Sequence, residues 1–247
     1  MTGGELILSF DTATTNCSIA VTSGNSVSGR VLGSVSFESG VTHSRRLLSS
    51  IDWLLKSVDV TVGDLAALAV GLGPGSFTGL RIGLAAAKGL CHGSGIGLIG
   101  VSSLDAIGTR VVSDKLICAV LDARKKEVYS CFYRSRPGAP GDGAIRCGEP
   151  AVLPPRELAG LINEPVTMAG DGVHVYSDIF VAALGDKLDL RPRPRWPDAV
   201  QIGYLAADAF RERRFLDLDD ASPEYIRTSD AQLSLVSPLN REQQGHK

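Results

Sequence analysis

An aspartate followed by small hydroxyl residues stands at the end of the first apolar run of the chain. The segment Asp11-Thr12-Ala13-Thr14-Thr15 follows directly after Leu6–Phe10. A carboxylate at a strand end can order metal-bound water, and hydroxyls with backbone N–H groups can surround a phosphate. The alternative is a hairpin turn in which Asp11 and Thr12 satisfy backbone groups. The pattern makes Asp11 and Thr12 weak candidates for a nucleotide or anion site.

A second candidate is the glycine-rich junction GLGPGSFTGLRIG, residues Gly71–Gly83. The pattern predicts a strand, a loop and a helix whose first N–H groups could face an anion near Gly75 and Ser76. The Gly-Lys-Ser/Thr of a Walker loop does not follow. A tight strand-to-helix connection explains the same glycines, so Gly75 and Ser76 are also weak candidates.

The helix that follows this loop carries small residues on one side. Gly79, Gly83 and Ala86 fall within one narrow sector at 100° per residue. A glycine inside a helix costs about 1 kcal/mol relative to alanine, so two on one side indicate close approach of another backbone. That backbone belongs either to an internal strand or to another subunit. We take these residues as partner contacts and predict that Gly83→Leu weakens pairing but leaves the monomer folded.

The preceding helix, about Ser44–Val58, has a tryptophan on its polar side. Its apolar sector centres on Ile51 and Val58, and Trp53 lies nearly opposite, near Arg46 and Ser49. A tryptophan there is either a scattered surface hydrophobe or an interface anchor. We favour the interface and take Arg46, Ser49 and Trp53 as partner-binding residues.

Several parts of a catalytic site are missing from the sequence pattern. A metal-binding helix starting at His43 would need a second histidine four residues on, where Leu47 stands. A second phosphate loop would need glycines after Asp122, but the next residues are Ala-Arg-Lys-Lys. We therefore predict no catalytic residues, no metal site and no firmly bound cofactor.

The elements that position these residues repeat along the chain. Strands at about Leu6–Phe10, Cys17–Thr22 and Arg30–Phe37 precede the first helix, and strand, helix and strand follow. The apolar run Leu116–Leu121, which enters Asp122, begins a similar order again. A duplicated unit of this kind is the layout of actin-like proteins, which have two α/β lobes of mixed sheet and helices. Three consecutive strands before the first helix argue against the alternative, an ordinary doubly wound sheet.

We place an N-terminal lobe at residues 1–104, a C-terminal lobe at 105–230 and a polar tail, predicted to be disordered, at 231–247. The formal net charge of −2 gives no field that favours nucleic acid. The N-terminal sequence MTGGELILSFDT lacks the features of a signal peptide, and no apolar run is long enough to cross a membrane. We therefore expect a cytoplasmic protein with no membrane partner.

Together these segments resemble the bacterial TsaB (YeaZ) family, and they occur in the order of that family over most of the chain. The GPGSFTGLRIG run is the most specific of them. The matching segments are LILSFDTATTNCSIAV, HSRRLLSSIDWLL, LAALAVGLGPGSFTGLRIGLAAAKGL, GVSSLDAI, LDARKKEVYSCFY and PEYIR.

The resemblance implies an actin-like fold with ribonuclease H-like lobes. It also implies a non-catalytic role in making tRNA threonylcarbamoyladenosine (t6A). The expected partners are the catalytic paralogue TsaD, met through the first two helices, the ATPase TsaE, and a second copy of the chain on the same surface. It implies tRNA contact through the complex rather than alone. Weak ATP or ADP binding stays open, at the cleft between the lobes or at the subunit boundary. The rival readings are an active actin-fold ATPase or sugar kinase, and a metalloprotease.

Overall fold

The computed structural model describes residues 5–38, 43–135, 143–189 and 193–226, and the side chains of residues 43–45 are also outside the description. The predicted tail at 231–247 and most of the Pro137–Gly143 loop therefore lie outside the described residues, as does the side chain of His43. No helix in the described part of the chain is both long and apolar enough to cross a bilayer.

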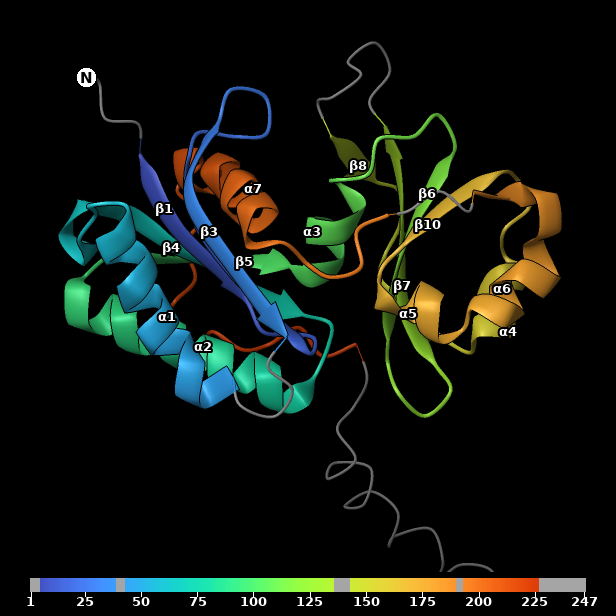
Figure 1. Ribbon diagram of the computed structural model, residues 1–247, viewed down its shortest axis with the longest axis horizontal. Helices are drawn as coiled ribbons and strands as arrows, with labels where there is room; N and C mark the ends of the chain where they lie inside the picture. Colours follow the sequence, from blue (N-terminus) through green and yellow to red (C-terminus); the bar gives the residue numbers. More distant parts are fainter. Residues whose placement is uncertain (1–4, 39–42, 136–142, 190–192, 227–247) are drawn as a thin grey trace, which may run out of the picture.

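The helices and strands form two lobes that stand side by side (Figure 1). The strands are β1 (Leu6–Asp11), β2 (Asn16–Ser23), β3 (Arg30–Glu38), β4 (Leu65–Gly73), β5 (Gly97–Ser102), β6 (Leu116–Asp122), β7 (Val128–Ser135), β8 (Ala144–Arg146), β9 (Ala151–Leu153), β10 (Val166–Ala169) and β11 (Leu188–Asp189). The helices are α1 (His43–Ser57), α2 (Phe77–Ser94), α3 (Ser103–Gly108), α4 (Pro155–Gly160), α5 (Asp171–Val175), α6 (Ser177–Leu184) and α7 (Ala199–Arg211), with 3-10 turns at Val62–Asp64 and Gly185–Lys187.

The two sheets repeat one topology. The first has the order β3-β2-β1-β4-β5, and the main path of the second has the order β8-β7-β6-β10-β11, so these five strands correspond one to one. The second sheet has an additional strand, β9, which pairs with β7. In the first sheet, β1, β2 and β3 are antiparallel neighbours, and β4 and β5 run parallel to β1. In the second sheet, β6, β7 and β8 are antiparallel neighbours, and β10 and β11 run parallel to β6. This duplication confirms the actin-like, ribonuclease H-like fold and excludes a single doubly wound sheet.

The last helix of each half crosses to the other lobe. α3 follows β5 but packs on β6 and β7, and its Leu104 and Ile107 join the core of the second sheet. α7 follows β11 but packs on β1 and β2 of the first sheet. Leu216, farther along, pairs with Leu98 of β5. The predicted C-terminal lobe at 105–230 is therefore wrong at its end, because residues 199–226 cover the first sheet.

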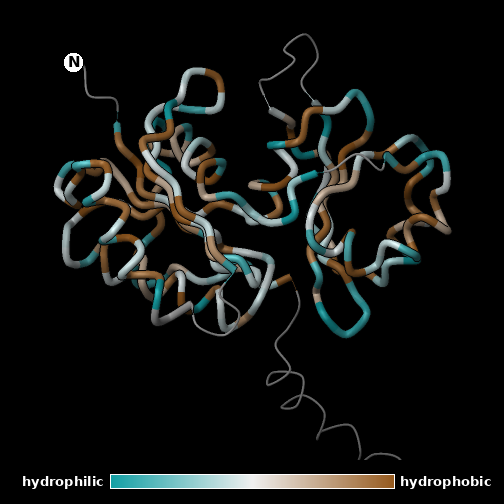
Figure 2. Tube along the Cα trace, viewed as in Figure 1, coloured by the Kyte–Doolittle hydropathy of each residue, from teal (hydrophilic) through white to brown (hydrophobic). Residues whose placement is uncertain are grey.

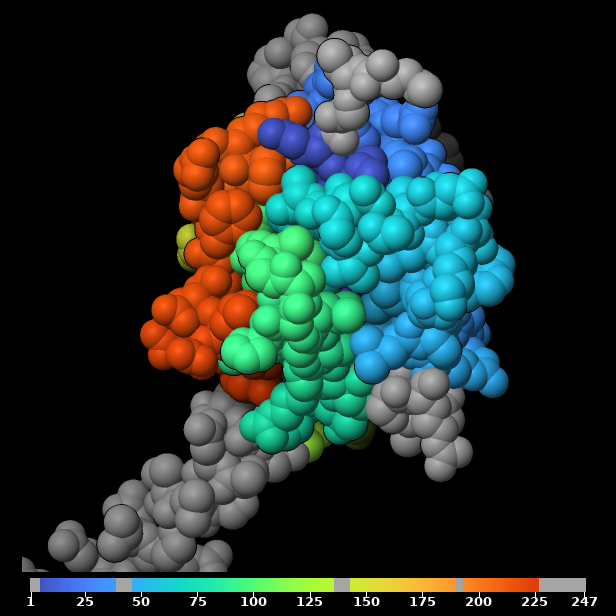
Figure 3. Space-filling model, turned by 90° about the vertical axis from the view of Figure 1, so that its left-hand side faces the viewer, coloured from blue at the N-terminus to red at the C-terminus, as the bar shows by residue number. Residues whose placement is uncertain are grey.

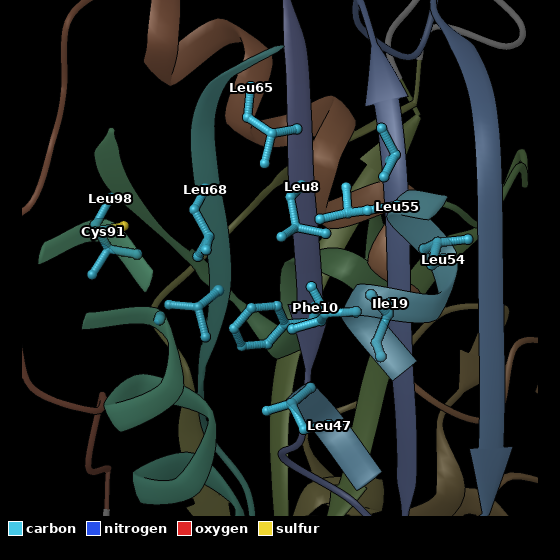
Figure 4. Close-up of a cluster of buried hydrophobic side chains, with 14 of the residues drawn as sticks. Leu8, Phe10, Ile19, Leu47, Leu54, Leu55, Leu65, Leu68, Cys91 and Leu98 are labelled. Carbon is cyan, nitrogen blue, oxygen red and sulfur yellow. The ribbon is translucent and has the colours of Figure 1, made fainter. Parts of the chain in front are cut away.

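Apolar side chains fill both faces of the first sheet. Leu8, Phe10 and Ile19 face Leu47 and Leu54 of α1 (Figure 4), while α2 covers the neighbouring strand. The opposite face packs against α7. The hydrophobic residues gather on the central strands, with more hydrophilic segments in the outer turns (Figure 2). Both layers hold the turn after β1 and the start of α2 in place.

Candidate functional site

The Asp11 carboxylate is closed off inside the first lobe. Its Oδ1 accepts a hydrogen bond from the backbone N–H of Ala13 at 2.8 Å, and its Oδ2 accepts one from Ser103 Oγ at 2.6 Å. Gly71 lies so close that a Cβ there would stand 2.0 Å from Oδ2. Only 1% of Asp11 is exposed, and burial raises its pKa to about 6. The carboxylate holds the turn to the start of α3 and does not line the cleft between the lobes.

Thr12 packs so closely against α2 that two positions of the helix have no room for a side chain. Its Oγ1 donates to the carbonyl of Gly79 at 2.8 Å. A Cβ on Gly79 would stand 2.0 Å from the Thr12 carbonyl oxygen, and one on Gly83 would stand 2.3 Å from Thr12 Oγ1. The close approach inferred from sequence is therefore internal. This corrects the expectation that Gly79 and Gly83 face a partner, because both are buried against the turn after β1.

Gly75 and Ser76, the two candidates from the glycine-rich loop, are not enclosed in the first lobe as Asp11 and Thr12 are. Gly75 and Ser76 line a cleft of about 580 Å³ between the lobes, together with residues Thr14, Phe77, Thr78, Asp122, Arg124 and Tyr129 among others. Asp11 and Thr12 do not line it. Of the four nucleotide or anion candidates, the structure thus brings two to the cleft and buries two beneath it.

The second lobe closes its side of the cleft with paired groups. Asp122, the counterpart of Asp11 at the end of β6, forms an ion pair with Arg124 at 3.2 Å and accepts a hydrogen bond from Tyr176 at 3.2 Å. Its backbone N–H donates to Asp171 Oδ1 at 2.9 Å. Arg124 and the two lysines after it all have positive φ angles. A basic turn stands where glycines would let backbone approach a phosphate. The described residues contain no group of three His, Cys, Asp or Glu that could hold a metal.

Asp11→Asn is expected to remove a pH-dependent loss of stability. The folded pKa of about 6 lies above the ordinary 3.8, so the folded state favours the protonated carboxyl. Its stabilising contribution is fully present below about pH 4 and is lost as the pH rises through 6, a change of about 2–3 kcal/mol for a fully buried group. The asparagine oxygen can still accept from Ala13 N–H, and its amide nitrogen can donate to Ser103 Oγ in place of accepting from it. Urea unfolding should show that the free energy of unfolding falls less between about pH 4 and pH 7 for the variant than for the native chain. Equal falls for the two chains would contradict a raised pKa of Asp11.

The outer face of α1 is open. Trp53 is 58% exposed and Leu48 is 52% exposed, while Arg46 and Ser49 are also exposed. Ser49 Oγ donates to the carbonyl of Arg46 at 3.0 Å, and Ser57 Oγ donates to that of Trp53 at 2.7 Å. These bonds satisfy both hydroxyls within the helix. Trp53 thus stands between two serines whose hydroxyls are satisfied within the helix, and the charged side chains of Arg46, Asp52 and Lys56 lie on the same exposed side of α1.

α2 lies beside α1 on the same side of the molecule (Figure 3). Its outer positions Ala85, Gly89 and Gly93 are exposed, at a spacing of four residues. A Cβ on Gly89 or Gly93 would meet nothing within 4 Å. Ala86 is half-buried and packs against the core. Sequence reasoning missed this second row of small residues, although its four-residue spacing could have revealed it. We call the exposed residues Arg46, Leu48, Ser49, Trp53, Ala85, Gly89 and Gly93 the α1–α2 face.

Known proteins resemble this chain over most of its length. Residues 31–234 match the family described as TsaD, tRNA N6-adenosine threonylcarbamoyltransferase. The TsaB proteins of Escherichia coli and Haemophilus influenzae are 32% and 34% identical, over 91% and 90% of this chain and 96% and 93% of their own. YeaZ from Pseudomonas aeruginosa superposes with a TM-score of 0.71 at 27% identity, over 90% of this chain and 99% of that one.

A longer relative also matches. An uncharacterized protein of Mycobacterium leprae is 35% identical over 170 residues, and the match spans 69% of this chain but only 44% of that protein. The full-length matches and the shared two-lobed fold lead to one assignment. The chain belongs to the TsaB (YeaZ) family, whose curated members are named for tRNA threonylcarbamoyladenosine biosynthesis.

Proposed function

We propose that the chain is a non-catalytic subunit of the t6A machinery that pairs with a TsaD-type catalytic paralogue through the α1–α2 face. The observation that carries the pairing is the combination of an exposed tryptophan on α1 with an open row of small residues on the adjacent helix. Aromatic anchors beside close-packed backbone are typical of specific interfaces.

The glycines of this row support a docking role for a physical reason. Gly89 and Gly93 weaken α2 by about 1 kcal/mol each relative to alanine. Nothing in the described part of the chain packs on either, in contrast to Gly79 and Gly83. A second backbone that docks here would explain why the helix carries no side chains at these positions.

The lack of catalysis is supported by the two strand-end carboxylates. Asp11 is sealed beneath the cleft by Ser103 and Ala13, and Asp122 is engaged by Arg124 and Tyr176. A carboxylate that orders metal or activates water must reach a ligand in the cleft. Asp11 does not line the cleft, and Asp122, which does, is already engaged by Arg124 and Tyr176. This arrangement disfavours an actin-fold ATPase and a metalloprotease.

The same face would serve a second copy of this chain, so homodimerisation and pairing with the catalytic paralogue would compete. We propose that a TsaE-type ATPase and tRNA join through the assembled complex, in the cytoplasm. Weak ATP or ADP binding belongs, in this proposal, to the cleft lined by Gly75 and Ser76 or to the subunit boundary. The size of the cleft, about 580 Å³, supports the first position, because small-molecule pockets span about 300–1,000 Å³.

Mixing the chain with its cognate TsaD-type and TsaE-type proteins tests the proposal. We expect a stable complex by light scattering and t6A formation that requires this chain. Steady ATP turnover by the chain alone, or t6A formation unchanged without it, would contradict a non-catalytic supporting role.

Gly89→Ala is expected to stabilise the isolated chain. The backbone there is ordinary helix and the space for a methyl group is open. Alanine should therefore raise the free energy of unfolding by about 0.5–1 kcal/mol, through helix propensity and a less flexible unfolded state. Urea denaturation at low protein concentration measures this. Gly79→Ala is the matched control and should lose stability instead, because its methyl group would meet the Thr12 carbonyl.

A further inference from the structure

A second pocket, away from the α1–α2 face, lies where the first lobe meets the start of α7. Its volume is about 220 Å³. Residues from β2, β3, the end of α3 and the segment before α7 line it, among them Asn16, Ser34, Ser36, Arg110, Arg195 and Trp196. None of these residues lines the cleft between the lobes.

The pocket carries a positive charge that no carboxylate of the described residues cancels. The Arg195 guanidinium lies 4.8 Å from the centre of the Trp196 ring, which holds it at the pocket, and no ion pair engages it in the described part of the chain. Arg110 is paired with Asp198 at 2.7 Å. The other Asp198 oxygen accepts from the backbone N–H of Val200. Two guanidinium groups and one carboxylate thus line the pocket, and both oxygens of that carboxylate are already engaged.

Asn16 supplies an amide group at the wall of the pocket. It is only 6% exposed, and its Oδ1 accepts from Ser36 Oγ at 2.9 Å. This side-chain bond of Asn16 uses its oxygen, so among the described residues the two amide N–H donors stay available to a ligand. By contrast, the first N–H of α7 is already taken by Ser18 Oγ at 3.0 Å. The donors left for a ligand are therefore side chains, not the helix end.

We propose that this pocket binds the phosphate group of a nucleotide. Guanidinium groups match phosphate oxygens in charge and geometry, and amide and hydroxyl donors complete such sites. A volume of about 220 Å³ equals that of about seven waters and lies below that of pockets for drug-sized ligands. It holds a phosphate with part of its sugar and leaves the base outside. The phosphate comes either from a free nucleotide or from an RNA strand.

Fluorescence of Trp196 provides a direct test. The chain has two tryptophans, so the Trp53→Phe variant leaves Trp196 as the only indole. The probes are inorganic phosphate, uridine, uridine 5′-monophosphate and a single-stranded oligouridylate. We expect a saturable change in emission with every phosphate-bearing probe and none with uridine. Tighter binding of the monophosphate identifies a free nucleotide, and tighter, salt-sensitive binding of the oligonucleotide identifies an RNA strand.

Variants on the same background separate the pocket from nonspecific charge. Arg195→Gln, at an exposed position, should weaken phosphate-dependent binding about tenfold or more, the loss expected for a charged hydrogen bond. Asn16→Asp should weaken it further by placing a carboxylate against the phosphate. Arg156→Gln, at an exposed position of α4 in the other lobe, is the matched control and should leave binding unchanged. Equal binding by the Trp53→Phe parent and its Arg195→Gln variant, a response to uridine, or no saturable response would overturn the proposal.

Discussion

Trp53→Ala is expected to weaken binding to a TsaD-type partner by about tenfold or more, and to leave the isolated chain as stable as before. The side chain is 58% exposed in the free protein, so its removal leaves no cavity. In the complex the indole would be fully desolvated, and truncating a central aromatic anchor commonly costs about 1–3 kcal/mol or more. The loss therefore belongs to binding and not to folding.

Titration calorimetry with the cognate partner measures this effect, and urea denaturation of each free chain checks the fold. Leu161→Ala is a suitable control, because Leu161 is 60% exposed on the second lobe, outside the α1–α2 face. It should bind with native affinity. Equal affinities for the native chain and Trp53→Ala would remove Trp53 from the interface, and an equal loss in Leu161→Ala would show that exposed apolar side chains act nonspecifically.

Helical and strand periodicity predicted most of this architecture. The apolar spacing of α1 placed Ile51 and Leu54 inside and Trp53 outside, and the structure confirms both. Strands β1, β2, β3 and β6 and helix α1 occur where they were expected, with ends displaced by one residue, and the expected strand and helix on either side of the glycine-rich loop are β4 and α2. The elements α3, α5, β9 and β11 were not predicted.

Contacts between distant segments were beyond a single sequence. The Asp11 turn looked open to an anion, but Ser103, ninety-two positions later, closes it. α7 was assigned to the lobe that precedes it in sequence, although its small residues pack on β1 and β2. Local pattern indicates which face of an element is apolar, but it does not say which sheet that face covers.

The two rows of small residues on α2 show this limit most clearly. Gly79 and Gly83 form one row, and Ala85, Gly89 and Gly93 form another. Helical spacing alone makes the rows equivalent as candidates for close packing. The structure separates them, since Thr12 occupies the first row and the second is open. The first row is part of the fold, and the second is the one available to a partner.

Gly83→Leu should therefore greatly lower the free energy of unfolding of the chain. The sequence alone suggested instead that this change leaves the monomer intact. The new side chain would strike Thr12 Oγ1 and disrupt its bond to the Gly79 carbonyl. Overpacking costs about 1–3 kcal/mol, and a buried polar group left unpaired costs about 1–3 kcal/mol more. The higher helix propensity of leucine relative to glycine offsets less than about 1 kcal/mol of this loss. The free energy of unfolding should fall by about 2–4 kcal/mol.

Gly89→Leu is the matched variant, because it makes the same change on the same helix, six positions later. Its side chain enters open space, so the isolated chain should be as stable as the native one or slightly more stable. The added bulk should instead block the close approach of a partner backbone and abolish pairing at concentrations where the native chain pairs fully. Urea denaturation and size-exclusion chromatography with light scattering, applied to both variants, give opposite results if the two rows have these separate roles. A stable Gly83→Leu chain would show that the row of Gly79 and Gly83 does not hold the fold. Normal pairing by Gly89→Leu would show that the row of Ala85, Gly89 and Gly93 does not mark the interface.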